Sequence, residues 1–323
     1  MKNIISVLPD RLKTALGCKK VFSSASEITI RLERPSCVSF GKEILYISSN
    51  GLTSDLSKAV LLYRYEIDDI FAKICKSSVY SFEDQIRNGF ISLGGGHRVG
   101  ICGTAVVKNG DLVGFRDING FVFRIAREIV GVAENVSKYI ISPQKVVNTA
   151  VISPPGGGKT TILRDLCRIL GEKGYKVSVV DERGELCGVS DGVSSFSSCL
   201  LCDILDCCPK ADGIDRALRT LCPDVIVFDE IGSLCEADNL VSAMNSGVSF
   251  IFSAHAESFS QAAKRPAIKK LLDCGALDLA IVLGTKEKRG TAVEIISITS
   301  GGDGYKADRI DIDPVGKFIL GDI

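Results

Sequence analysis

The sequence predicts an α/β protein in which a mainly parallel sheet follows a smaller α+β domain. The chain has 323 residues, which favours two domains at ~100–200 residues per domain. Short, fully apolar, β-branched runs alternate with helical segments in the second half, as in parallel strands covered on both faces. Half-buried strand patterns dominate the first half. We therefore expect an α+β domain over 1–135, a linker or short helix over 136–148 and an α/β domain over 149–323.

Composition and charge exclude several classes of protein. With 46% apolar residues, the chain has enough material for two cores, which excludes wholesale disorder. Lys+Arg and Asp+Glu both number 39, so no net basic field favours a nucleic acid, and we expect no nucleic-acid partner. No run of about 20 apolar residues and no signal-peptide pattern occurs, so we expect a cytoplasmic protein with reduced thiols.

In the first domain, alternating apolar residues predict strands, and helical spacing extends from Thr53 to Ser78 in two pieces around Tyr65. Ser81 is expected to cap a short helix that carries acids in its first turn. The segment Lys108–Asp111 contains Asn-Gly between two strand patterns, which predicts a hairpin. The predicted strands are a pair over 27–40, then 91–93, 98–107 and 120–126.

In the second domain the pattern changes to strand, loop and helix. A strand over 149–152 enters a Pro/Gly-rich loop, and a helix over 160–170 follows and stops at Gly174. The other predicted strands are 176–180, 225–228 and 248–252, all of the fully buried type.

The strongest chemical signal is the loop Ser153–Thr160, which reads Ser-Pro-Pro-Gly-Gly-Gly-Lys-Thr. It matches the phosphate-binding pattern G-x-x-x-x-G-K-[ST] except that Ser153 replaces the first glycine. Main-chain N–H groups and the helix N-terminus would bind ATP phosphates, Lys159 would supply a cation, and the Thr160 hydroxyl would bind Mg²⁺. An ordinary glycine-rich turn is the alternative. The residues expected to bind nucleotide here are Ser153, Pro154, Pro155, Gly156, Gly157, Gly158, Lys159, Thr160 and Thr161.

Acidic residues follow two of the predicted strands, and a histidine follows a third. If the strand over 225–228 lies next to the phosphate loop, Asp229 joins the Mg²⁺ shell and Glu230 polarises the attacking water. His255 is placed to sense the γ-phosphate; a core or capping histidine is the alternative. Asp181 and Glu182 end a further strand, where they would support the metal or the water, or form structural salt bridges. These motifs together predict a RecA-like P-loop ATPase core with Glu230, Lys159, His255 and Glu182 as catalytic candidates.

Several strings resemble known families. The run Arg216–Asp224 and the later Ala254-His255-Ala256 resemble the hexameric ATPases of type II and type IV secretion and pilus machines. The stage III sporulation protein AA family of endospore-forming bacteria is similar over more of the chain, from about Glu27 to Leu283. Four strings carry that second resemblance: 94–101 (GGGHRVGI), 123–128 (FRIARE), 179–185 (VVDERGE) and 203–211 (DILDCCPKA).

The resemblance implies a Mg²⁺-dependent ATPase made in the mother cell that acts peripherally at the inner face of the membrane. It would serve membrane proteins of the channel complex between mother cell and forespore. The resemblance also implies a homo-oligomeric ring, expected to be a hexamer, in which arginines contact nucleotide, some of them from a neighbouring subunit. The candidates are Arg98, Arg116, Arg124 and Arg127 in the first domain and Arg216 and Arg219 in the second, with surface ion pairing as the alternative for each. Ser153 and the many cysteines depart from the family pattern.

Thirteen cysteines raise the question of a metal site. Cys199-x-x-Cys202 followed by Cys207-Cys208 resembles a four-thiolate set, but adjacent cysteines suit one tetrahedral ion poorly. We expect these residues to pack as small apolar groups, with no bound metal. The glycines at 94–96 precede a strand rather than a helix, so we expect a turn and no second nucleotide site.

Three other functions fit parts of the sequence. A P-loop phosphotransferase would need an acceptor pocket with an arginine-rich lid, which the sequence does not display. An ATP-gated nucleic-acid-binding module conflicts with the zero net charge. A nucleotide-binding scaffold without useful turnover agrees with Ser153 at the first loop position.

Overall fold

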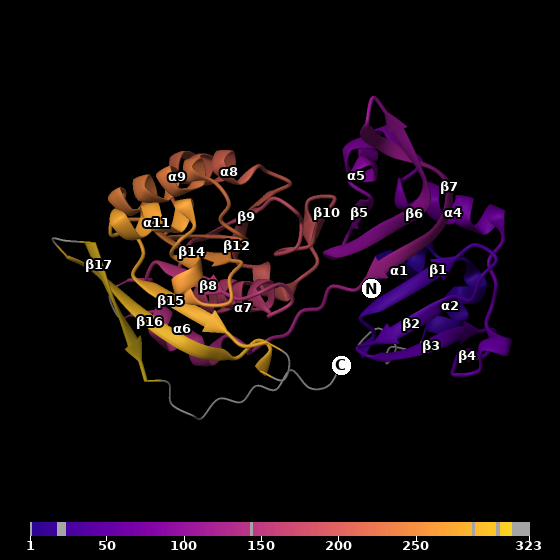
Figure 1. Cartoon of the computed structure of the whole chain (residues 1–323), viewed down its shortest axis with the longest axis horizontal. Coiled ribbons are helices and arrows are strands. Elements are labelled where there is room, and N and C mark those ends of the chain that lie inside the picture. The colour runs from indigo at the N-terminus through magenta and orange to yellow at the C-terminus, as the bar shows by residue number, and fades with distance from the viewer. Residues whose placement is uncertain (1, 18–23, 143–144, 286–287, 302–303, 312–323) are drawn as a thin grey trace. The chain divides into compact units, whose positions relative to one another are not determined.

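The computed structural model describes residues 2–17, 24–142, 145–285, 288–301 and 304–311. These residues form two compact units, coloured from indigo to yellow along the chain in Figure 1. Unit 1 contains the chain up to Arg127 and the segment Gly188–Ser195, and unit 2 contains Glu128–Cys187 and the chain from Phe196 on. These units are groups of residues in contact, whereas a domain is a part of the chain that folds on its own. The domain boundary expected near residue 135 therefore stays a prediction.

Unit 1 is built on a seven-stranded antiparallel sheet with the order β4-β3-β2-β1-β7-β6-β5. Its strands are β1 (Glu27–Arg31), β2 (Cys37–Phe40), β3 (Glu43–Ser48), β4 (Gly51–Thr53), β5 (Phe90–Leu93), β6 (His97–Lys108) and β7 (Asp111–Arg124). Its helices are α1 (Lys2–Val7), α2 (Asp10–Leu16), α4 (Arg64–Ile74) and α5 (Glu83–Arg87), with 3-10 turns η1 (Leu56–Lys58) and η2 (Val79–Phe82). A two-stranded sheet, β10 (Val189–Ser190) with β11 (Val193–Ser194), belongs to the same unit.

The core of unit 1 follows from the alternation that predicts its strands. Ile28 and Ile30 on β1 are fully buried, and they lie opposite Phe123 and Phe121 on β7. Side chains of α1, α2 and α4 join the same apolar cluster. The buried side chains of β1 and β7 therefore pack against these helices on one face of the sheet.

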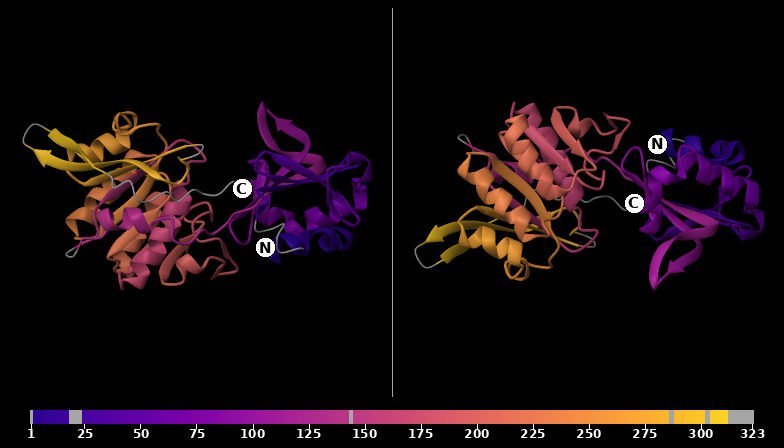
Figure 2. Two further views of the ribbon diagram at one scale, coloured as in Figure 1. Left: turned by 90° about the horizontal axis from the view of Figure 1, so that it is seen from below. Right: turned by 90° about the horizontal axis from the view of Figure 1, so that it is seen from above.

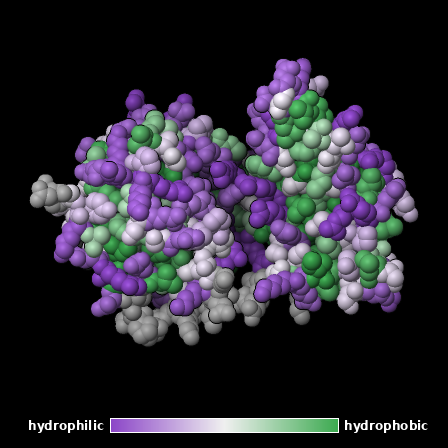
Figure 3. Space-filling model, in the orientation of Figure 1, coloured by the Kyte–Doolittle hydropathy of each residue, from purple (hydrophilic) through white to green (hydrophobic). Residues whose placement is uncertain are grey.

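The β6–β7 hairpin confirms the turn predicted at Lys108–Asp111. Asn109 has a φ of +55°, as a tight hairpin turn with Asn-Gly requires. β7 begins at Asp111, well before the predicted strand, so the hairpin is longer than expected. Its end is exposed, and Val107 there is 61% exposed. Figure 3 shows an apolar area on this hairpin.

Two local predictions for unit 1 are wrong. The segment from Thr53 to Ser78 forms one helix, α4, preceded by a short 3-10 turn, because Tyr63 caps α4 and Leu62 pairs with Leu32 as an isolated bridge. Ser81 lies inside η2 and does not cap α5, whose N-cap is Phe82.

Unit 2 contains an eight-stranded, mainly parallel sheet with the order β12-β9-β13-β14-β8-β15-β16-β17. Its strands are β8 (Thr149–Ile152), β9 (Val177–Asp181), β12 (Cys202–Asp206), β13 (Val225–Phe228), β14 (Ser249–Ala254), β15 (Leu279–Leu283), β16 (Ala292–Gly301) and β17 (Gly304–Ile310), of which the last two are antiparallel. Its helices are α6 (Glu134–Ile140), α7 (Lys159–Glu172), α8 (Lys210–Arg216), α9 (Leu234–Asn245), α10 (Phe259–Ala262) and α11 (Pro266–Asp273), with a 3-10 turn η3 (Ser197–Cys199) and a π-helical turn η4 (Ala217–Leu221).

Helices cover both faces of this sheet, as the buried strands predict (Figures 1 and 2). α8, α9 and α11 pack with Phe228 and Phe250 in one apolar cluster. α7 covers the other face and contacts β8, β9, β13 and β14. One expectation is wrong: β14 lies between β8 and β13, so the acidic strand is not the direct neighbour of the phosphate-loop strand.

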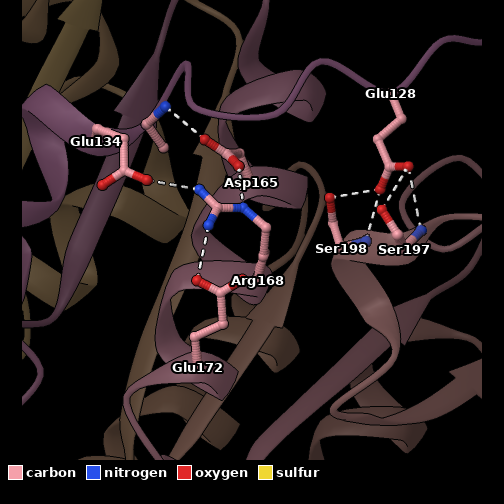
Figure 4. A network of polar contacts seen from close by, with 8 residues as sticks. Glu128, Glu134, Asp165, Arg168, Glu172, Ser197 and Ser198 are labelled. Carbon is pink, nitrogen blue, oxygen red and sulfur yellow. Dashed lines mark hydrogen bonds and ion pairs between the residues drawn. The ribbon is translucent and has the colours of Figure 1, made fainter.

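Two polar networks attach the chain after Arg127 to unit 2 (Figure 4). The Glu128 carboxylate accepts hydrogen bonds from the backbone N–H and the hydroxyl of both Ser197 and Ser198. Burial alone would raise the pKa of Glu128, but these bonds lower it. Farther along, Arg168 on α7 pairs with Glu134 of α6 at 2.7 Å.

Within the described residues, the chain passes between the two units three times, after Arg127, Cys187 and Ser195. The middle excursion carries β10 and β11, and it interacts with residues early in the chain. Asp191 pairs with Lys76 at 2.6 Å, and the Gly95 N–H donates to the Gly188 carbonyl at 3.3 Å. Unit 1 thus contains a hairpin that the sequence places between β9 and β12 of unit 2.

Among the residues that the structure describes, no helix combines the length and the apolar character needed to cross a bilayer.

His97, at the start of β6, makes the stability of unit 1 dependent on pH. Its side chain is 3% exposed, and its Nδ1 accepts a hydrogen bond from the Ala126 N–H at 3.1 Å. Burial lowers the pKa of His97 from 6.5 to about 4. Because the unfolded chain takes up the proton first, stability from this group is complete above pH 6.5 and is lost as the pH falls toward 4.

We expect that loss to reach roughly 3 kcal/mol, since one pKa unit corresponds to about 1.4 kcal/mol. The variant His97→Asn keeps an acceptor near the Nδ1 position but does not titrate. Its melting temperature is expected to fall less steeply than that of the parent between pH 6.5 and 4. Equal slopes for the two proteins would show that other groups cause the acid sensitivity.

Candidate functional site

The loop between β8 and α7 has the backbone that a phosphate-binding loop requires. Gly158 has a φ of +97°, which other residues adopt only with strain. A Cβ on Gly158 would lie 3.1 Å from Gly290, whose N–H donates to the Gly157 carbonyl at 3.0 Å. The connection between β15 and β16 therefore packs directly against this loop.

Ser153, at the position where the pattern expects glycine, is accommodated by its neighbour. Its side chain is fully buried, and its hydroxyl donates to the Pro154 carbonyl at 2.9 Å. A Cβ on Gly157 would lie 2.1 Å from the Ser153 hydroxyl oxygen, so Gly157 leaves the space that Ser153 fills. Pro155 and Gly156 are exposed at the tip, and Thr161 lies in the first turn of α7.

Lys159 is the central cation of the site and is only 6% exposed. Its ammonium donates to the carbonyls of Ser153 at 2.9 Å and Pro154 at 3.2 Å, and to His255 Nδ1 at 2.8 Å. Burial lowers the pKa of Lys159, although the carboxylates of Asp229 and Glu230 act in the opposite direction. The side chain thus supports the loop that it belongs to, and it does not point freely into solvent.

Thr160, in the first turn of α7, and Asp229, directly after β13, lie together although β8 and β13 are not neighbours. The Thr160 hydroxyl donates to Asp229 Oδ2 at 3.1 Å. Asp229 Oδ1 accepts from the hydroxyl of Ser253, a fully buried residue of β14, and from the Glu230 N–H at 3.0 Å. β14 therefore bridges the gap between β8 and β13 with a side chain that orients the Asp229 carboxylate.

Glu230 is held in a backbone conformation that is unusual for glutamate. Its φ is +33°, in the left-handed region, which typically costs about 1–3 kcal/mol. Its N–H donates to Asp229 Oδ1 and, at 3.1 Å, to the Ser253 hydroxyl. Strain of this kind is common where a side chain must be aimed at a ligand.

His255 connects the lysine to the glutamate. Its Nδ1 lies 2.8 Å from the Lys159 ammonium and its Nε2 lies 3.4 Å from Glu230 Oε2. Because an ammonium group only donates, Nδ1 is the acceptor and Nε2 carries the proton toward Glu230. His255 is therefore placed to respond when the contacts of Lys159 change.

Glu182 and Asp181 differ in their contacts. Glu182 lies 3.0 Å from the ammonium of Lys210, which is 12% exposed in its side chain, and both line a small acidic pocket with Asp229 and Glu230. Asp181 accepts hydrogen bonds from the main-chain N–H groups of Glu185 and Cys187. Burial raises the pKa of Asp181. Both residues line the pocket, but the Asp181 carboxylate is engaged in ordering the loop after β9 and Glu182 is the more exposed of the two.

The candidate arginines of unit 1 lie on its sheet and at its end. Arg98 and Arg124 are directly opposite each other on β6 and β7. The Arg98 guanidinium lies 4.2 Å above the Phe90 ring, and Arg124 pairs loosely with Glu27 at 3.6 Å. Glu27 lies at the same register position on β1, so one acid stands beside the two like charges of Arg98 and Arg124.

The remaining arginines are engaged locally or exposed. Arg127 donates to the carbonyls of residues 24 and 25, which leaves it a structural role within unit 1. Arg116 is exposed on the hairpin, 3.7 Å from Asp117. In unit 2, Arg216 ends α8 and is exposed, and Arg219 in η4 pairs with Asp215 at 2.8 Å. π-helical turns are often found at functional sites.

The residues present fit both ligands that the sequence predicts. The glycine loop at the N-terminus of α7 provides the main-chain donors and the cation that a phosphate needs. The Thr160 hydroxyl and the Asp229 carboxylate provide oxygen ligands of the kind that Mg²⁺ prefers.

Comparisons with known proteins agree with this geometry. The model of the family described as "Sporulation stage III, protein AA" matches residues 1–301. Stage III sporulation protein AA of Bacillus subtilis (strain 168) is 35% identical over 302 residues, which are 91% of this chain and 94% of that protein. The family predicted from the sequence strings is thereby confirmed.

Two solved structures share the fold. The Legionella pneumophila ATPase DotB matches with a TM-score of 0.54 and 16% identity, over 95% of this chain and 83% of that one. The pilus retraction motor PilT with bound ADP matches with a TM-score of 0.52 and 15% identity, over 90% and 80%. The predicted fold class, a RecA-like P-loop ATPase core after a smaller α+β domain, is confirmed.

Sequence reasoning missed the residues that support the site from other strands and helices. Ser253 belongs to no sequence motif, and its position two residues before His255 is the one signal that could have indicated it. Lys210 lies inside one of the strings that resemble the family, but nothing in that string indicates a partner for Glu182. No sequence pattern predicts a role for Gly290, because that role depends on the fold of the β15–β16 connection.

The four cysteines that the sequence groups together differ in their surroundings. Cys199 is buried with its thiol 3.7 Å from the Leu186 carbonyl, whereas Cys207 is exposed with its thiol 3.6 Å from the Asp206 carboxylate. Throughout the described ranges, no group of three or more His, Cys, Asp or Glu side chains is arranged to hold a metal ion.

We expect the protein, purified without oxygen, to carry zinc and iron far below one ion per chain. Elemental analysis of the purified full chain measures this directly. A content of about one ion per chain would contradict the expectation and would identify the cysteines as ligands.

Proposed function

Because the chain belongs to the sporulation stage III protein AA family, we propose that it is a Mg²⁺-dependent ATPase. Its hydrolysis of ATP would power assembly or transport by the channel complex between mother cell and forespore. One observation carries the enzymatic part of this proposal. A phosphate loop, a metal-binding pair and a strained glutamate meet at the carboxyl ends of β8, β13 and β14, where open α/β sheets bind ligands.

Lys159 would leave the loop carbonyls and bind the β- and γ-phosphates. The exchange is favourable because its burial in a low-dielectric loop strengthens a bond to an anion. His255 loses its lysine partner in that exchange. To donate to the γ-phosphate, its ring would take the tautomer that carries the proton on Nδ1, which gives up the Nε2–H contact with Glu230. Occupancy of the site is thereby communicated to Glu230, the other partner of His255.

Glu230 would accept a proton from the attacking water as general base. Its backbone is fixed from two sides, by Asp229 and by Ser253, so its carboxylate needs little reorganisation to reach the reacting water. Thr160 and Asp229 would hold Mg²⁺, which neutralises charge on the phosphates. Glu182 is a weaker candidate for the same role, because Lys210 already neutralises it.

The functional form would be a ring of identical chains, a hexamer in our proposal, attached to the inner face of the mother-cell membrane through membrane proteins of the channel complex. Arg98 and Arg124 would contact phosphate from a neighbouring chain, since they lie at one register position of β6 and β7 and a guanidinium can bind a phosphate through two donors. ATP hydrolysis would then change the contacts between chains. Mass photometry with and without ATP measures the number of chains.

Lys159→Ala is expected to weaken ATP binding by at least about 10- to 100-fold, the worth of a charge-assisted hydrogen bond of roughly 1.5–3 kcal/mol. Calorimetry measures the affinity. Lys173→Ala is the matched control, since it removes an exposed lysine at the other end of the same helix. Unchanged affinity in Lys159→Ala, with the fold intact by circular dichroism, would show that the loop does not bind phosphate.

Glu230→Gln is expected to lower turnover by ~10²–10⁴ while ATP affinity stays nearly the same, because only the general base is lost. The variant should trap ATP, and any ATP-dependent oligomer should live longer than in the parent. Steady-state turnover and mass photometry measure the two effects. Glu257→Gln, an exposed glutamate beyond β14, is the matched control.

Turnover of Glu230→Gln within about twofold of the parent would mean that another carboxylate orients the water. Glu182→Gln then identifies it, since Glu182 is the other pocket-facing glutamate after a strand end.

A further inference from the structure

The last strand of the unit 2 sheet leaves one edge open. β17 pairs with β16 on one side, and within the described ranges no strand pairs with its other side (Figure 1). About half of its main-chain N–H and C=O groups therefore point away from the sheet. Six of its seven residues are exposed, and its register with β16 runs without a shift. A regular, exposed edge of this kind can pair with a further strand.

The sequence of β17 is complementary to itself when it is read in the opposite direction. Two identical strands that pair antiparallel about a twofold axis place one residue opposite its own copy at the centre. With Ala307 at the centre, Lys306 lies opposite Asp308 of the second copy, and the reverse pair forms on the other side of the axis. Tyr305 and Arg309 are matched in the same way. All seven residues of β17 take part in this pairing.

The charges of β17 favour this register over its neighbours. Moving the centre to Lys306 places two ammonium groups directly opposite each other, and moving it to Asp308 does the same with two carboxylates. Like charges at opposed positions destabilise a pair of strands, whereas opposite charges stabilise it. A lysine on a sheet edge often prevents strand pairing. Here the charges exclude the wrong registers instead, and they leave one in which each charge meets an opposite charge or an aromatic ring.

On one face of β17, Lys306 and Asp308 already form an ion pair within one chain. The ammonium lies 2.9 Å from the carboxylate, and both side chains are more than half exposed. Pairing centred on Ala307 would bring two such pairs together, so that each charge gains a second opposite neighbour. An isolated exposed ion pair contributes little to stability, whereas charges joined in a network contribute more.

On the other face, Tyr305 and Arg309 are placed for a contact between copies. The Tyr305 ring meets the Phe259 ring edge-on, with centroids 6.3 Å apart, and this contact orients it. Arg309 has an ion pair with Glu294 at 3.8 Å and a hydrogen bond to the Val293 carbonyl at 3.5 Å, both of them long. In the paired arrangement each guanidinium would lie directly opposite a tyrosine ring, which attracts a cation.

We propose that β17 is an interface at which the protein binds a second copy of itself, by antiparallel strand pairing centred on Ala307. The two eight-stranded sheets would then continue into each other. A twofold contact of this kind is satisfied by two chains, so it does not build the ring proposed above. It involves no residue of the candidate nucleotide site, and it joins two chains whether or not they hydrolyse ATP.

Sedimentation velocity of the nucleotide-free full chain tests this interface. We expect the average mass to rise with protein concentration, and the association to weaken as salt screens the exposed charges. Lys306→Asp places carboxylates opposite each other, and Asp308→Lys does the same with ammonium groups. Each variant alone should dimerise at least about tenfold more weakly than the parent, because two attractive pairs become repulsive. Both positions are exposed, and circular dichroism verifies that the fold is intact.

Mixing the two variants separates strand pairing from a local effect. In a mixed dimer, both carboxylates of Lys306→Asp face both ammonium groups of Asp308→Lys. An equimolar mixture should therefore associate about as strongly as the parent, although neither variant does so alone. Glu43→Lys reverses an exposed acid on β3, an inner strand of unit 1, and is the matched control that should behave as the parent.

Ala307→Cys tests the register directly. Its thiols would lie opposite each other, at a Cα separation of about 4.5–5.5 Å that a disulfide can span. Mild oxidation should link two chains at this position, as peptide mass spectrometry shows, and adding Asp308→Lys should remove most of the link. A parent that stays monomeric would mean that something other than a second copy covers the edge. That result, or a variant mixture that stays dissociated, would overturn the proposal.

Discussion

The candidate site depends on one buried ammonium group, that of Lys159. It bonds to the carbonyls of its own loop and to His255 at the end of β14, and His255 in turn reaches Glu230 after β13. A cation with little exposure is tolerated only where such partners compensate for lost water. The same group thus stabilises the loop, connects three strand ends and is available to bind a phosphate.

Much of the fold could be predicted because the relevant signals are local. Apolar, β-branched runs identified β8, β9, β13 and β14, and the Asn-Gly pair located the β6–β7 turn. Predictions that depend on the surrounding residues were wrong. Ser81 was expected to cap a helix, but it lies inside the 3-10 turn that precedes that helix. Strand order is a similar case, since no local pattern indicates that β14 separates β8 from β13.

Within the site, sequence motifs located the side chains that would meet a ligand, and the structure brings Lys159, Thr160, Asp229, Glu230 and His255 together. The supporting residues could not be predicted, because their identity is generic. A serine becomes the partner of Asp229, and a lysine the partner of Glu182, only when β14 and α8 are placed beside them.

The excursion that carries β10 and β11 makes the two units topologically inseparable. No single cut of the backbone yields both in full: a fragment that begins after Arg127 retains Gly188–Ser195 without its partners, Lys76 and Gly95. Unfolding of unit 1 would release that hairpin and so loosen the segment between β9 and β12. A protease would therefore have to cut the described chain at three places, after Arg127, Cys187 and Ser195, before the two units could separate.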